Sequence, residues 1–173
     1  MRIRSENLYG FGPYSDPLIN PLKVKALPAK MNQPTRDAST NPEQVVINWI
    51  PLTAPLNGDS EILGYNVQWD AGTSGMTWSD VSLPVQSYTG TQISVVDNVI
   101  QGESYQFKVR ARNIYGFGAF SDVSTVVASS RPGEPEIATT TTQGTGSVIG
   151  FFAPDTNGAM ITAYTIKIAG IDD

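Results

Sequence analysis

Phe107-Lys-Val-Arg-Ala-Arg-Asn-Ile-Tyr-Gly-Phe-Gly-Ala-Phe-Ser-Asp122 restates, about a hundred residues later, the opening stretch Met1-Arg-Ile-Arg-Ser-Glu-Asn-Leu-Tyr-Gly-Phe-Gly-Pro-Tyr-Ser-Asp16. Eight of the sixteen positions are identical, among them the Asn, the Tyr-Gly-Phe-Gly run and the final Ser-Asp. A repeat with a long, fixed period is typical of an array of similar structural modules.

A second pair of similar stretches gives the same period. Val45-Val-Ile-Asn-Trp-Ile-Pro51 is echoed by Val148-Ile-Gly-Phe-Phe-Ala-Pro154, and an Asn-Gly turn follows each copy. An alternating apolar stretch comes next in both copies, at Tyr65–Trp69 and at Tyr164–Ile168. A repeat unit of about a hundred residues is a common size for one domain.

This period divides the chain into three parts. We expect the carboxy-terminal part of one module in residues 1–30, a complete module in residues 31–131 and the amino-terminal part of a third in residues 132–173. The junctions at Leu27–Pro34 and Arg131–Pro135 are short and contain Pro, so the modules should have restricted orientations.

Neither partial module can close a core alone, because a few strands bury too little surface to offset chain entropy. Two alternatives remain open for them. Their missing strands lie in a longer parent protein, or the head of one chain completes the tail of another by strand exchange.

Composition excludes several classes of function. The 173 residues contain no histidine and no cysteine, so Ser-His-Asp and Cys-His catalysis, a disulfide framework and the usual zinc site are ruled out. The net charge of −5 argues against duplex nucleic acid as a partner. No apolar run approaches the length of a membrane span, and no small-molecule substrate is indicated.

Paired carboxylates are the remaining option for chemistry. Asp59 and Glu61 stand in a loop, Asp155 stands in another, and Asp172 and Asp173 are near the carboxyl end. Acids in turns usually serve solubility and turn geometry, and no Asp-x-Asp spacing supports calcium. We therefore expect no catalytic, cofactor-binding or metal-binding residue, and no enzyme.

Apolar residues alternate with polar ones instead of recurring at helical spacing. Val45–Trp49, Tyr65–Trp69 and Tyr105–Ala111 each place an apolar residue at every second position, and turns rich in Pro and Gly separate them. About seven short strands in a hundred residues predict an all-β sandwich of two sheets.

Four motifs resemble the fibronectin type III family. They are Trp49 two residues before Pro51, Tyr65-x-Val67-x-Trp69, Gly102-x-x-Tyr105, and Val109-Arg-Ala-Arg-Asn113 followed by Gly116-x-Gly118 and Ser121. The resemblance covers the whole chain, with Gln101 where the family often has Pro. It implies an immunoglobulin-like sandwich in which one complete seven-stranded module is flanked by two partial ones.

The resemblance also implies structural roles. Trp49 would fill the centre of the core, and Tyr105 would form a tyrosine corner whose hydroxyl bonds to backbone just upstream. The residues expected in the core are Trp49, Tyr65, Val67, Trp69, Tyr105, Phe107 and Val109.

Aromatic residues in and beside the loop after the sixth strand are the candidate protein-contact site. They are Tyr115, Phe117 and Phe120 in one copy and Tyr9, Phe11 and Tyr14 in the other. Aromatic loop residues are favoured binding anchors. The alternative is that one or two of them fold back onto the edge of the sandwich or pack against the next module. The loop contains no Arg-Gly-Asp, so integrin-type adhesion is not supported.

Two classes of function fit these features. The modules act as a spacer, scaffold or adhesive array through contacts with other proteins or neighbouring modules, or they are accessories of a larger enzyme or cell-surface receptor. The absence of cysteines and of Asn-x-Ser/Thr sequons favours a cytoskeletal or ciliary setting, although bacterial surface arrays have the same composition.

Overall fold

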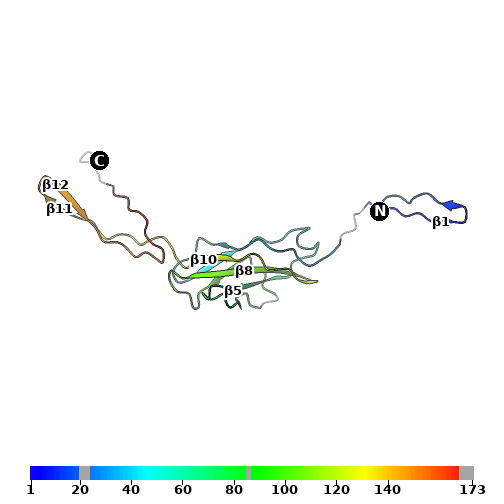
Figure 1. Ribbon diagram of the computed structural model, residues 1–173, viewed down its shortest axis with the longest axis horizontal. Helices are drawn as coiled ribbons and strands as arrows, with labels where there is room; N and C mark the ends of the chain where they lie inside the picture. The colour runs from blue at the N-terminus through cyan, green and yellow to red at the C-terminus, as the bar shows by residue number, and fades with distance from the viewer. Residues whose placement is uncertain (20–23, 85–86, 168–173) are drawn as a thin grey trace.

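The computed structural model describes residues 1–19, 24–84 and 87–167, and the described residues form strands and loops without any helix. No membrane-spanning helix is therefore found among them. Figure 1 shows a central sandwich with a hairpin at one end, coloured blue, and an orange to red segment at the other. The two flanking segments thus leave the sandwich from opposite ends.

The central sandwich consists of two antiparallel sheets. The first has the order β3 (Thr35–Arg36), β4 (Val45–Asn48), β7 (Gln92–Val95). The second has the order β10 (Ser124–Val127), β8 (Ser104–Asn113), β5 (Gly64–Trp69), β6 (Ser79–Asp80), and the short β9 (Gly116–Phe117) also pairs with β8. This is the two-sheet, all-β architecture expected from the alternating sequence.

Strand β8 is the longest strand, and its residues alternate strictly between the two faces of its sheet. The odd-numbered residues from Tyr105 to Asn113 are buried, whereas the even-numbered residues from Gln106 to Arg112 are partly exposed. Val109 lies opposite Val67 on β5, and Phe107 lies opposite Trp69. Complete burial of a side chain such as Phe107 contributes about 1.5–3 kcal/mol.

The core between the sheets combines aliphatic and aromatic side chains. Trp49 packs edge-on against Tyr65 with ring centroids 5.6 Å apart, and Trp69 stacks on Tyr105 at 5.4 Å. Such aromatic pairs contribute about 0.5–1.5 kcal/mol beyond the area they bury. The structure places all seven residues assigned above to the core at 7% exposure or less: Trp49, Tyr65, Val67, Trp69, Tyr105, Phe107 and Val109.

A buried carboxylate organises the turn that follows β5. Asp70 is 1% exposed, and its two oxygens accept hydrogen bonds from the backbone N–H groups of Gly72, Gly75 and Gln106 at 2.9–3.0 Å. Buried polar groups are stable only when they are paired in this way. Asp70 therefore holds the turn against strand β8.

The two flanking segments are each built on a β-hairpin. In the amino-terminal hairpin, β1 (Glu6–Asn7) pairs with β2 (Gly10–Phe11). Backbone hydrogen bonds from Gly12 to Ser5 and from Leu18 to Met1 extend this pairing. In the carboxy-terminal segment, β11 (Thr139–Gln143) pairs with β12 (Gly146–Gly150).

One detail of the carboxy-terminal repeat differs from the sequence prediction. The stretch expected to be a strand at Tyr164–Ile168 is not one within residues 161–167, and Ile168 lies outside the described residues. The corresponding β5 is held by β8 and β6, and residues 161–167 have no such partner in the described part of the chain. Phe151 packs on Tyr164 at 4.9 Å, whereas Phe152, which aligns with Trp49, is 72% exposed.

The tyrosine corner of β8 is present. The hydroxyl of Tyr105 donates to the carbonyl of Asn98 at 3.2 Å and accepts from the N–H of Ile100 at 2.7 Å. We expect Tyr105→Phe to lower the free energy of unfolding by about 1–3 kcal/mol, because two partly buried backbone groups lose their partner. Urea denaturation followed by tryptophan fluorescence measures this loss. Tyr115→Phe, at a ring that is 48% exposed, is the control and should change nothing.

Candidate functional site

The loop aromatics of the second copy divide into two groups. Phe117 and Phe120 are partly buried against the outer face of the β8 sheet, while Tyr115 is 48% exposed. Phe117 lies opposite Arg112 in the β8–β9 register, so its ring is carried over the outward side chains of β8. Two of the three rings thus cover the sandwich itself.

Cations and rings alternate along this outer face, which we call the cation–ring ladder. The ammonium of Lys108 lies 3.8 Å from the centroid of Trp78 and 4.8 Å from that of Phe120. The guanidinium carbon of Arg110 lies 4.3 Å from Phe120 and 4.4 Å from Phe117. Each such contact contributes about 0.5–1 kcal/mol at an exposed site and more where water is excluded.

The ladder covers a polar network. Asn66 points to the outer face and yet is fully buried; its amide oxygen accepts from Nε of Arg110 at 3.0 Å, and its amide nitrogen donates to Asp80 at 2.6 Å. The pKa of Lys108 is lowered, mainly because the ammonium is partly removed from water and to a lesser extent because the positive charge of Arg110 is nearby. Arg110 therefore pairs with a buried polar group of the sheet as well as with the rings.

The amino-terminal hairpin contains a shorter form of the same ladder. The guanidinium carbon of Arg4 lies 3.8 Å from the centroid of Phe11 and 4.8 Å from that of Tyr14. Here the aromatic residues are more exposed: Tyr9 is 93% exposed, Phe11 57% and Tyr14 55%. The aromatic repetition in the sequence thus corresponds to a repeated contact with arginine.

Polar contacts of the two copies also agree. The side-chain oxygen of Asn7 accepts from the N–H of Tyr9 at 2.9 Å, and that of Asn113 accepts from Tyr115 at the same distance. Ser15 accepts from the backbone N–H of Ile3 at 3.2 Å, and Ser121 accepts from that of Val109 at 3.1 Å. The identical residues of the repeat therefore specify one local structure.

The upstream linker is held against two loops of the sandwich. The N–H of Ala26 donates to the carbonyl of Gly58 at 3.0 Å. A Cβ at Gly58 would lie 2.1 Å from the carbonyl oxygen of Ala26, and one at Gly118 would lie 2.3 Å from that of Pro28. Only glycine permits such close approach of the linker backbone.

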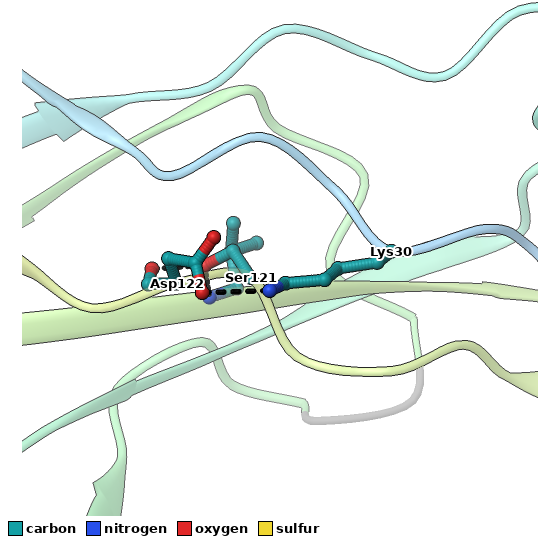
Figure 2. Close-up of polar contacts among 4 residues, drawn as sticks. Lys30, Ser121 and Asp122 are labelled. Carbon is teal, nitrogen blue, oxygen red and sulfur yellow. Dashed lines mark hydrogen bonds and ion pairs between the residues drawn. The ribbon is translucent and has the colours of Figure 1, made fainter.

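Asn113 joins the linker to both loops. Its amide nitrogen donates to the carbonyl of Ala26 at 2.7 Å and to that of Asn57 at 3.1 Å. An ion pair lies further along the linker: Nζ of Lys30 is 2.6 Å from a carboxylate oxygen of Asp122, beside Ser121 (Figure 2). The ion pair is half exposed or more on both sides, so it adds at most about 1 kcal/mol.

The downstream linker is also bonded to a loop, in this case a loop of the carboxy-terminal segment. The N–H of Ser130 donates to the carbonyl of Asn157 at 3.0 Å, and that of Gly133 donates to Asp155 at 2.9 Å. Both junctions thus involve an Asn-Gly turn, Asn57-Gly58 upstream and Asn157-Gly158 downstream. We call these the junction turns.

The acidic residues considered above lie in loops wherever the structure describes them. Asp155 accepts hydrogen bonds from Asn157 and Gln101 in the downstream junction, and Asp172 and Asp173 lie outside the described residues. Across residues 1–19, 24–84 and 87–167, no cluster of three or more acidic side chains could hold a metal ion.

Sequence reasoning missed the ladder and the roles of the junction turns. The alternation of Phe107–Asn113 was a usable signal for the ladder, because it directs Lys108, Arg110 and Arg112 to the outer face. The two Asn-Gly pairs were recognised as turns, but nothing local to them identifies the backbone that each would touch.

Comparison with known proteins places this geometry in a family. The family model for the fibronectin type III domain matches residues 32–127. The chain is 27% identical to mouse fibronectin type-III domain-containing protein 3A over 75% of its length, and 32% identical to human myomesin-2 over 79%. It spans 10% and 9% of the lengths of these two relatives.

Among solved structures, the FN1–FN3 domains of chicken CNTN1 share the fold. That crystal structure matches with a TM-score of 0.54 and 22% identity, covering 87% of this chain and 50% of the other.

Removal of the Asn113 amide tests the upstream junction. We expect Asn113→Ala to lower the free energy of unfolding by about 1–3 kcal/mol, because the carbonyls of Ala26 and Asn57 are left unpaired. Asn7→Ala, at the exposed equivalent position, should have no effect on urea unfolding of the sandwich. Equal effects of the two variants would contradict the role given to Asn113.

A double-mutant cycle between Arg110 and Phe120 tests the ladder. The coupling free energy from urea unfolding should be about 0.5–1 kcal/mol in favour of the pair. Arg110 with Val127 is the control pair, because Val127 lies opposite Ser104 at the far end of β8, and its coupling should be near zero. Equal coupling free energies for the two pairs would contradict a stabilising role of the ladder.

Proposed function

The chain belongs to the fibronectin type III family, and on that basis we propose that its modules are non-catalytic spacers or scaffolds within a larger tandem-repeat protein. They act through contacts with neighbouring modules and other proteins. The mouse and human relatives named above are many times longer than this chain, which fits a fragment of a repeat protein.

The observation that carries this proposal is the bonding of both linkers. Upstream, the N–H groups of Ala26 and Ala29 donate to Gly58 and Leu56 at 3.0 and 2.8 Å. Downstream, Ser130 and Gly133 donate to the loop that contains Asn157. A linker with its backbone paired transmits orientation and load between its neighbours, whereas a flexible linker does not.

We further propose that the flanking segments are parts of modules like the central one, with bounds 1–30, 31–131 and 132–173. The amino-terminal hairpin supports this, since its hydrogen bonds and cation–ring contacts match those of β8 and β9. The carboxy-terminal segment supports it as well, because β11 and β12 are followed by an Asn-Gly turn as β3 and β4 are.

Backbone dynamics test the spacer proposal. In the intact chain, we expect ¹⁵N order parameters of the linker residues 24–30 and 129–133 to match those of the sandwich strands, near about 0.85. Values below about 0.6 in both linkers would contradict it, because independently tumbling parts cannot hold a fixed spacing. The tip of the β11–β12 hairpin, at Gly144, provides an internal standard for a mobile turn.

A further inference from the structure

The downstream junction turn is seated on the end of the central sandwich, and we propose that it is a docking element that fixes the angle between consecutive modules. Its partner is the end of the preceding module: Gln101, Gly102 and the strand end Ala128–Arg131. This inference rests on the proposed function, because an angle has meaning only within an array.

Two glycines meet at the centre of the contact. A Cβ added to Gly158 would lie 2.7 Å from the carbonyl oxygen of Ala128 and 2.8 Å from the backbone nitrogen of Gly102. A real Cβ does not approach backbone atoms this closely, so a larger residue would push the turn away. The contact is made by backbone on both sides, which leaves little freedom for side chains to adjust.

Hydrogen bonds surround this glycine contact. The side-chain amide of Asn157 donates to the carbonyl of Arg131 at 2.7 Å, and its own carbonyl accepts from Ser130. Asp155 accepts from the amide of Gln101 at 3.3 Å and from the N–H of Asn157 at 2.8 Å. The turn is thus bonded to the sandwich on more than one side, which restricts rotation as well as separation.

The upstream junction turn shares the central glycine contact. Gly58 and Gly158 both have positive φ, 73° and 83°, and each lies against the carbonyl of an alanine, Ala26 in one case and Ala128 in the other. An Asn-Gly turn requires glycine for its backbone angles alone. Both glycines meet a second requirement as well: the alanine carbonyl beside each of them leaves no room for a Cβ. A docking role explains why it recurs.

Distance measurements between two spin labels test the docking. The chain has no cysteine, so Thr125→Cys on β10 and Thr141→Cys on β11, both exposed, can be labelled uniquely. The comparison uses this doubly labelled chain alone, with Gly158→Ala and with Gly144→Ala. Gly144 is the matched control, because its φ is also positive, 61°, but a Cβ there meets nothing within 4 Å.

We expect a narrow distance distribution in the parent and in Gly144→Ala. In Gly158→Ala, the mean should shift by more than the parent width, or the distribution should broaden. Asp155→Ala removes the hydrogen bonds from Gln101 and from the N–H of Asn157 without changing a glycine, and it should also broaden the distance distribution. All three tryptophans, Trp49, Trp69 and Trp78, lie in the central sandwich, so their fluorescence verifies that this part remains folded in each variant.

The outcomes separate the inference from the function on which it rests. A narrow distribution that is the same in the parent and in Gly158→Ala would overturn the docking role and leave the spacer proposal intact. Equal broadening in both glycine variants would also overturn it, since strain at a positive φ would then be sufficient. A broad distribution in the parent itself would overturn both, because the junction would not hold an orientation.

Discussion

The alternation of strand β8 is the constraint on which the other features depend. Its inward side chains, from Tyr105 to Ala111, form one wall of the core, and its outward side chains form the cation–ring ladder. Asn113, at the end of the strand, belongs to the same buried set of odd-numbered residues, and its amide therefore lies beside the linker. A slip of one residue would exchange the two faces and lose core, ladder and junction together.

The junctions depend instead on glycines, which have no Cβ. Gly58, Gly118 and Gly158 each allow a carbonyl of the adjoining backbone to come closer than a Cβ would permit. Backbone contacts of this kind fix position with little dependence on which side chains surround them.

The sequence predicts what local pattern determines. Two-residue alternation indicated the two-sheet sandwich, and the resemblance to the fibronectin type III family implied the corner at Tyr105 whose hydrogen bonds the structure shows. Features that depend on contacts with residues far along the chain could not be predicted from the sequence. The stretch at Tyr164 has the strand pattern but no paired strand among the described residues, and the backbone opposite each junction turn is set by the path of the chain.

Comparison of the two copies of the repeated motif separates its local from its long-range content. The turn at Asn7, the contacts of Arg4 with two rings and the bond to Ser15 are all made within residues 1–19. These parts of the motif are therefore local. The asparagine amide nitrogen differs: in Asn113 it bonds the linker and the Asn57 turn, and it can do so only where both are present. Asn113 thus connects the local turn to the junction, and the other residues of the motif stabilise the turn that positions Asn113.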